Sequence, residues 1–520
     1  MKKKLQLLFA VAVFATQLMF AQQRFLNPVF SGVTKTSNVQ YSTNLSVLTG
    51  TPSAVSLLMD VYEPTGDTMS KRPVVIVLHT GSFLPRYINR QATGDKTDSA
   101  VVETCNRFAK MGYVACAVAY RTGWNPTALG SAGQDVRTGT LLNAVYRAIQ
   151  DVKSSVRFLK KEQMGANLYR TDSTKIAVMG YGSGGYVSYA AATLNKYSEI
   201  VLGKFISGTT SQPYIDTTLS GNFDGTLARP LCLPTNLGHT SNYAAAVAIG
   251  GAAGDSSWME AGDVPFIGMQ CTKDPNAPYN FGQVIVPTTG DFVVDASGSG
   301  DMIRISNQLG NNTSLNSAPT NVYTTKAASM NGGVKGLYPF FTAPIPAASA
   351  LTCGTPIAAG EEGGPWDWWN ESAYIAGYTP YAAGGAIEAT VTNCVLKYGS
   401  PGWGATKGRL YIDTIVGFTS ANLFAALSLP TVFVGVNEVE LAKNVNLYPN
   451  PANTNVTIAS IDNTVINTVV VMDVTGKTIV SASVNANNYT INYNSLSKGV
   501  YVVKVQFANG KEANKKLIVE

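Results

Sequence analysis

The sequence predicts an α/β protein whose mostly parallel sheet is covered by helices on both faces, followed by a small all-β domain. Between residues 56 and 190, short apolar runs typical of buried strands alternate with segments whose apolar residues recur every three or four positions, as in core-facing helices. Such alternation favours a parallel sheet between helical layers. From residue 446 onward, strand-like alternations are instead separated by turn signals such as TGK and ANGK.

Each element of the first domain follows from this pattern. The expected strands are SLLMDVYEP (56–64), RPVVIVLHT (72–80), YVACAVAY (113–120) and KIAVMG (175–180). Residues 99–112 and 140–163 have helical spacing, and 410–430 restore that spacing at the end of the domain. Residues 280–400 are rich in Gly, Ala, Asn, Thr and Pro with weak periodicity, which predicts long loops and insertions over the functional edge of the sheet, with extra short strands as a further option.

The amino terminus and the composition indicate an exported protein. MKKKLQLLFAVAVFATQLMFA, residues 1–21, has a basic start, an apolar run and a terminal alanine, the layout of a cleavable signal peptide. Only 13% of residues are charged, and the net charge of +6 is spread without a basic run, so nucleic-acid binding has no support. No later apolar run is long enough for a transmembrane helix. The predicted boundaries are domain 22–432, linker 433–445 and domain 446–520.

The cysteine and histidine inventory excludes the common metal sites. Six cysteines are widely spaced without a CxxC pair, and the chain has two histidines, so we expect no metal and no cofactor. Export permits disulfides, for which Cys353 with Cys394 is the preferred pair, although sequence alone does not fix the pairing. Cys116, within an apolar run, is expected in the core.

The carboxy-terminal segment has several ordered motifs. LYPNPA lies near its start, VxDxTGK in the middle and LSKGVYVVKV before a basic last strand. These resemble the type A C-terminal sorting domain of the type IX secretion system of Bacteroidetes. The resemblance implies the secretion machinery as a partner, and localisation outside the cell or at its outer surface. The alternative is an ordinary β-sandwich appendage.

VMGYGSGGY, residues 178–186, follows a predicted strand and precedes a predicted helix, as a nucleophile elbow does. This turn requires small residues two positions either side of the nucleophile. If Ser183 were the nucleophile, Tyr181 would collide with the turn, whereas Gly182 has Gly180 and Gly184 at these positions. The expected nucleophile position is therefore Gly182, and glycine adopts the strained backbone at little cost.

This segment resembles the elbow of the carboxylesterase and acetyl-esterase branch of the α/β-hydrolases, where a serine usually stands at the place of Gly182. RPVVIVLHTGSF is similar to the strand and HGGG-type oxyanion loop of that family. The resemblance implies a structural role for His79 and oxyanion N–H groups from Gly81, Ser82 and Ser183. VPFIGMQCTKDPNAPY is similar to the loop of the catalytic acid, which places that acid at Asp274.

The triad histidine has no counterpart in the expected order of nucleophile, acid and histidine, because no histidine follows His239. We therefore expect a secreted protein without a working Ser-His-Asp triad that serves in binding or structure. The alternative is an active esterase on an acylated polysaccharide or small ester. It would use Ser183 or another serine, Asp274 and His239, or one of the lysines Lys326, Lys335, Lys397 and Lys407. Ser183 has a further interpretation as the N-cap of the following helix.

Two other motifs give further hypotheses. Gly180, Gly182 and Gly185 form GxGxxG, but Glu199 follows helix-like sequence instead of a second strand, so a dinucleotide loop is disfavoured. In the predicted insertion, indole rings alternate with carboxylates, which suits the stacking of sugar rings; packing of these rings against the sheet is the alternative. The candidate ligand-binding residues are Trp366, Asp367, Trp368 and Trp369, with Trp403 nearby.

Overall fold

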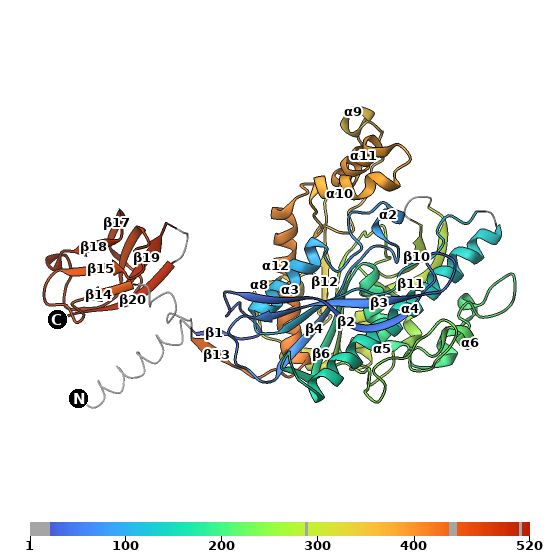
Figure 1. Cartoon of the computed structure of the whole chain (residues 1–520), viewed down its shortest axis with the longest axis horizontal. Coiled ribbons are helices and arrows are strands. Elements are labelled where there is room, and N and C mark those ends of the chain that lie inside the picture. The colour runs from blue at the N-terminus through green and yellow to red at the C-terminus, as the bar shows by residue number, and fades with distance from the viewer. Residues whose placement is uncertain (1–20, 130, 287–289, 436–444, 509–511) are drawn as a thin grey trace. The chain divides into compact units, whose positions relative to one another are not determined.

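The computed structural model of this chain describes residues 21–129, 131–286, 290–435, 445–508 and 512–520 (Figure 1). The chain divides into two compact units, which are treated separately: one is Arg24–Thr431, and the other contains Val432–Glu520 and the residues before Arg24. In the second unit, β1 (Ala21–Gln23) pairs antiparallel with β13 (Phe433–Gly435). The expected signal peptide, apart from Ala21, and linker residues 436–444 lie outside the described residues.

The first unit is built on an eight-stranded sheet in the order β12-β9-β7-β6-β4-β5-β3-β2. The strands from β12 to β5 run parallel, and β3 and β2 join antiparallel at one edge. The strands are β2 (Val33–Ser46), β3 (Ser53–Pro64), β4 (Arg72–Leu78), β5 (Val114–Val118), β6 (Thr171–Tyr181), β7 (Ala245–Ile249), β9 (Phe266–Cys271) and β12 (Leu337–Phe340). Residues of β4 and β5 are fully buried because both faces of the sheet are covered.

Helices cover the two faces of this sheet, as the fold class predicts (Figure 1). On one face, Ile76 of β4 packs in a core with α4 (Ser131–Met164), α5 (Ser183–Thr193) and α7 (Ser299–Gln308). On the other face, Val77 packs with α3 (Ser99–Lys110) and α12 (Ala405–Ala426). Since alternate residues of a strand point to opposite faces, a single strand supplies both cores.

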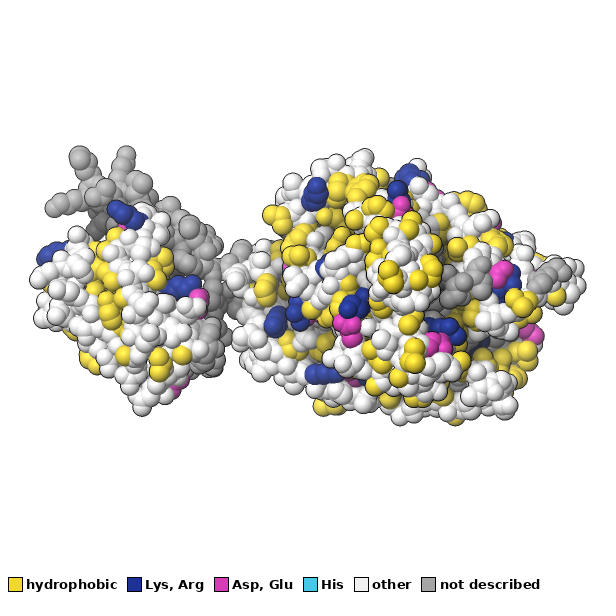
Figure 2. Space-filling model, turned by 90° about the horizontal axis from the view of Figure 1, so that it is seen from above, with side chains coloured by type: hydrophobic (Ala, Val, Ile, Leu, Met, Phe, Trp, Pro, Cys, Tyr) yellow, Lys and Arg dark blue, Asp and Glu magenta, His cyan; other side chains and the backbone are white. Residues whose placement is uncertain are grey.

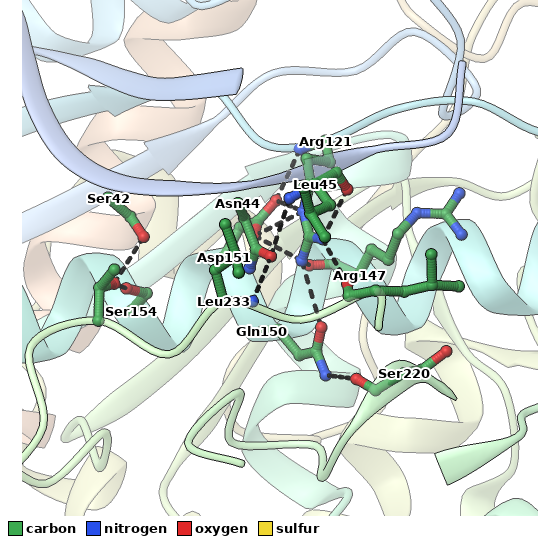
Figure 3. A network of polar contacts seen from close by, with 12 residues as sticks. Ser42, Asn44, Leu45, Arg121, Arg147, Gln150, Asp151, Ser154, Ser220 and Leu233 are labelled. Atoms are coloured by element: carbon green, nitrogen blue, oxygen red, sulfur yellow. Dashed lines mark hydrogen bonds and ion pairs between the residues drawn. The ribbon is translucent and has the colours of Figure 1, made fainter. Parts of the chain in front are cut away.

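A buried ion pair holds α4 against the segment that follows β5 (Figure 3). The Arg121 guanidinium and the Asp151 carboxylate are almost completely buried, with Nη2 2.8 Å from Oδ1, and the Arg121 backbone N–H also donates to Oδ2 at 2.8 Å. Arg121 further donates to the carbonyl of Leu45, and Gln150 donates to that of Ser220. This network ties α4 to β2 and to the loop around residue 220.

Residues 280–400 are more regular than their composition suggested. The segment contains β10 (Phe281–Ile285), β11 (Phe292–Gly298), α7, α8 (Val322–Ala328) and β12 before α9 (Ala350–Cys353), α10 (Glu371–Tyr378) and α11 (Gly385–Tyr398). β10 and β11 form a small sheet with β8 (Ala252–Ala253). The sequence pattern allowed for extra short strands but predicted no helices here, whereas α7 and β12 extend the α/β core and β12 pairs parallel with β9. The excursion from the core is confined to about residues 341–404, called the cap below.

A disulfide crosses the cap, as predicted from the sequence. Cys353 of α9 is bonded to Cys394 of α11, with a Cα–Cα distance of 5.5 Å. The other four cysteines, including Cys116, are free and buried. The charged side chains on the visible face are few and scattered, in keeping with the low charge content (Figure 2).

The carboxy-terminal domain contains two antiparallel sheets, β14-β15-β18 and β17-β16-β19-β20, that share one core. Alternate residues such as Val469, Val471, Val503 and Val505 fill this core, as the period of two predicts. The strands are β14 (Val445–Tyr448), β15 (Val456–Ser460), β16 (Ile466–Asp473), β17 (Thr478–Ala486), β18 (Asn488–Ile491), β19 (Gly499–Phe507) and β20 (Glu512–Val519). No helix among the described residues is long and apolar enough to span a membrane.

Candidate functional site

A cavity of about 470 Å³ opens at the carboxyl ends of the parallel strands, where α/β folds usually bind ligands. Its wall contains the turns after four strands: Gly81 and Ser82 after β4, Gly182 and Ser183 after β6, Gly250 after β7 and Asp274 after β9. Parallel strands bring these turns to one edge although up to 193 residues separate them in the sequence. Five of these six residues, all except Gly250, were proposed from the sequence, and the structure brings them together.

The turn after β6 has the geometry of a nucleophile elbow with Gly182 at its apex. Gly182 has φ +47° and ψ −114°, a conformation that residues with a side chain rarely adopt, and α5 begins directly after it. A Cβ on Gly180 would lie 2.0 Å from the backbone of Gly184, and one on Gly184 would lie 2.6 Å from the carbonyl oxygen of His79. The turn thus needs glycine two positions either side of Gly182, as the steric argument requires.

Thr80 occupies the space that a side chain at position 182 would need. A Cβ built on Gly182 would lie 2.1 Å from Thr80 Oγ1 and 3.0 Å from Thr80 Cβ. Sequence reasoning did not single out Thr80, although threonine at the second position of an HGGG-type loop was the signal available. Positions 80 and 182 are therefore sterically matched. Gly182 has no side chain, and the side chain of Thr80 fills the space that one would need.

Ser183 is the first residue of α5, and the residue is only 6% exposed. Its Oγ lies 3.0 Å from the Tyr120 hydroxyl, which is also 2.8 Å from the carbonyl of His79. Because Tyr120 has one proton and donates it to that carbonyl, Ser183 donates to the Tyr120 oxygen. Burial raises the pKa of Tyr120, so the phenol is not a base for Ser183. The interpretation of Ser183 as N-cap is wrong, since Gly182 holds that position and no side chain caps the helix.

Among the described residues, Ser183 Oγ is hydrogen-bonded to Tyr120 and to neither histidine. His79 is 2% exposed, its Nδ1 lies 2.6 Å from the carbonyl of Thr80, and its ring stacks on Tyr120 at 4.3 Å. Burial lowers the pKa of His79, so the ring is neutral and structural. His239 is on the loop that leads into β7, at the sheet edge opposite the elbow, and is absent from the described cavity wall. The structure therefore does not bring His239 to Ser183 or Asp274.

Asp274 follows β9, and its carboxylate faces the cavity wall. Oδ1 accepts hydrogen bonds from the backbone N–H groups of Asn276 at 2.8 Å and Ala277 at 3.3 Å. Burial raises the pKa of Asp274 to about 7 despite these two bonds. The chain after β12 packs on this carboxylate, since a Cβ on Gly363 would lie 2.5 Å from Oδ1. Thus Gly363, not an imidazole, lies against the acid.

Comparison with known proteins agrees with this geometry. Residues 59–220 match the BD-FAE family model, and residues 446–520 match the model described as secretion system C-terminal sorting domain. The chain is an esterase-like α/β-hydrolase domain joined to a secretion system C-terminal sorting domain. The sorting domain indicates secretion by the type IX system to the cell surface or the extracellular space. No curated protein matches the chain in sequence.

Solved structures similar to the hydrolase domain include forms of esterase 2 from Thermogutta terrifontis. The butyrate-bound form is 16% identical over 56% of this chain and 80% of its own, with a TM-score of 0.30. The form phosphorylated by paraoxon is 17% identical over 48% of this chain and 74% of its own, with a TM-score of 0.29.

The loop after β4, where the sequence predicts oxyanion groups, has a tight backbone conformation. Gly81 has φ +114° and Ser82 φ +52°, and a Cβ on Gly81 would lie 2.5 Å from Gly94 Cα. Gly81, Ser82 and Ser183 all line the cavity. The N–H of Ser183 belongs to the first turn of α5, where backbone N–H groups have no partner within the helix. These three residues can therefore present polar backbone groups to a bound ligand.

The tryptophans of the cap pack within the protein. Trp366 is 2% exposed and its ring contacts Tyr181, with centroids 5.9 Å apart. Trp368 lies against Gly408, and Trp369 packs on Trp403 with centroids 5.0 Å apart. Trp366, Asp367 and Trp369 reach the cavity wall. Burial and neighbouring carboxylates raise the pKa of Asp367 well above its usual value.

A buried cluster on the cap side of the cavity was not predicted as a group. The Lys407 ammonium donates to Glu362 at 2.5 Å, to Ser400 Oγ at 3.1 Å and to the carbonyl of Pro401 at 2.6 Å. These three bonds direct the Lys407 side chain to the cluster. None of the lysines considered as bases, Lys326, Lys335, Lys397 and Lys407, is among the described residues of the cavity wall.

Proposed function

We propose that this secreted protein uses its hydrolase domain to bind a ligand at the carboxyl edge of the sheet, without hydrolysis by a Ser-His-Asp triad. The observation that supports this most is the matched pair at the elbow. Gly182 supplies no nucleophile, and Thr80 lies where the nucleophile's side chain would be. Loss of either serine or histidine from a triad removes most of its catalysis; here the elbow has glycine at position 182 and no histidine follows Asp274 in the sequence.

The alternative function is an active esterase that uses a different serine. Ser183 is the candidate, but its hydroxyl donates to a buried phenol, and a nucleophile needs a base within about 3.2 Å of its proton. Asp274 has no imidazole to orient. A glycan as ligand has less support than the sequence suggested, because the candidate indole rings pack against other aromatic rings, although Trp366 and Trp369 also reach the cavity wall.

Hydrolysis of p-nitrophenyl acetate and butyrate by the full secreted chain tests this proposal. We expect rates equal to those with buffer, for the wild type and for Ser183→Ala alike. The double variant Thr80→Gly with Gly182→Ser restores space and a hydroxyl but no histidine, so we expect it to remain inactive as well. Saturable turnover by the wild type that disappears in Ser183→Ala would refute the proposal.

A further inference from the structure

The cavity continues from the elbow along α5 as an apolar channel. Four lining residues of this segment, Ser183, Tyr186, Ala190 and Leu194, recur every three or four positions and therefore share one face. From Ser183 to Leu194 this face extends about 16 Å, at 1.5 Å per residue. The cavity is thus longer than a small acyl group such as acetyl requires.

Aliphatic side chains of α4 also line the cavity. Leu141, Val145 and Ile149 line the cavity and recur every four residues along this helix. β11 adds Val294. Such a wall offers dispersion contacts and no hydrogen bonds, so it suits an aliphatic chain better than a sugar ring.

The charged groups of the cavity wall lie on the turn after β9 and on the cap. The charged side chains among its described lining residues are all acidic: Asp274, Glu361, Glu362 and Asp367. Glu362 is neutralised by Lys407, and Glu361 by Lys273. Burial raises the pKa values of Asp274 and Asp367, which favours their neutral forms and leaves hydroxyl-type donors at this end. An anionic ligand head would find no cationic side chain among the described lining residues to offset the loss of its hydration.

We propose that the cavity binds an uncharged amphiphile, with its aliphatic chain between α4 and α5 and its hydroxyl head among the carboxyl and backbone groups of the elbow. This inference rests on the proposed binding function and specifies its ligand class. The proposed ligand class includes a long-chain alcohol and excludes a fatty acid of the same length, because the fatty acid has the same chain but an anionic head.

Fluorescence titration of the full chain at pH 7 with decan-1-ol, decanoate and decylammonium tests this proposal. Trp124, Trp258, Trp366 and Trp369 line the cavity and report binding. We expect decan-1-ol to bind at least tenfold more tightly than decanoate, and no more weakly than decylammonium. Octan-1-ol should bind about fourteenfold more weakly than decan-1-ol, because each buried CH₂ contributes about 0.8 kcal/mol.

Val145→Lys places an ammonium in the apolar channel, and Val136→Lys is the matched control, since Val136 lies on the same helix, is 42% exposed and does not line the cavity. We expect Val145→Lys to bind decan-1-ol at least tenfold more weakly than the wild type and decanoate more tightly. The affinities of Val136→Lys should equal those of the wild type. Val145→Phe narrows the channel without charge and should also weaken decan-1-ol.

Three results would overturn the ligand class: decanoate within threefold of decan-1-ol, affinity independent of chain length, or decylammonium tenfold tighter than the alcohol. Unaltered decan-1-ol binding in Val145→Lys and Val145→Phe would place the ligand elsewhere. These outcomes are separate from the ester assay, because alcohols and amines have no ester bond. Ester turnover would refute the proposed function, whereas failure of alcohol binding would refute only the ligand class.

Discussion

Substitution of Gly180 by alanine tests the steric basis of the elbow. The new methyl carbon would lie 2.0 Å from the carbonyl carbon and oxygen of Gly184, where carbon atoms normally stay 3.5–4.0 Å apart. Backbone must therefore move by about 1.5 Å to restore normal contacts, in a turn whose other side contacts Thr80. Overpacking of this kind costs about 1–3 kcal/mol and sometimes more, and we expect about 3 kcal/mol here because both clashing atoms are backbone.

Urea unfolding of the full chain, followed by tryptophan fluorescence, measures this loss. All six tryptophans lie between residues 124 and 403, so the signal reports the hydrolase domain alone. Gly185→Ala is the control: its Cβ would lie 3.1 Å or more from its neighbours, inside α5, where alanine is favoured over glycine by about 1 kcal/mol. A free energy of unfolding for Gly180→Ala within 0.5 kcal/mol of the wild type would refute the assigned register of the elbow.

Three further predictions concern the stability of the same domain. Asp151→Asn leaves the buried Arg121 guanidinium without its counter-charge, so urea unfolding should show a loss of about 3 kcal/mol, and no loss would mean that water reaches this pair. Cys353→Ser opens a disulfide that spans 41 residues and should lower the free energy of unfolding by roughly 4 kcal/mol in the loop-entropy model, read from a denaturant melt; an unchanged melt would show that the cap does not unfold with the core. Because the folded pKa of Asp274 is raised to about 7 from about 3.9 when unfolded, the folded state holds an extra proton between these values and stability falls as pH rises through that window. In thermal melts, the stability of Asp274→Asn relative to the wild type should therefore increase from pH 4 to pH 8. A stability difference that does not change with pH would contradict the raised pKa of Asp274.

Much of the hydrolase fold could be predicted from local patterns. The runs around Ile76 and Cys116 are buried on both faces, and their continuous apolar character identified β4 and β5 as central strands. The helical spacing of residues 410–430 likewise corresponds to most of α12. These elements have long or strongly periodic apolar patterns, and for that reason a single sequence was enough to predict them.

The segment from 299 to 340 was misread because its elements are short and depend on tertiary contacts. α7 has ten residues, and β12 has four that form a strand only through pairing with β9. Small and polar residues such as Ser299 and Ser306 are buried there, which weakens the apolar period. The sequence pattern of this segment therefore resembles that of loops, and only the pairing of β12 with β9 in the structure shows that it contains a strand.

Within the site, the glycine register was accessible from sequence because it follows from steric rules at fixed spacing. The contact between Thr80 and Gly182 was not, since the two residues are 102 positions apart and meet only when β4 and β6 pair. The apolar channel was also hidden, because Leu141 and Val145 have the same helical spacing whether they face a packed core or a cavity. Prediction from sequence thus reached the backbone of the site but not the space inside it.

Intact-mass analysis after treatment with a fluorophosphonate tests the central claim most directly, that the elbow of this hydrolase domain has no activated serine. The reagent labels serines made nucleophilic by a nearby base. We predict no adduct on the full chain under conditions that fully label an active serine esterase. A stoichiometric adduct mapped to Ser183, and absent from Ser183→Ala, would contradict the account.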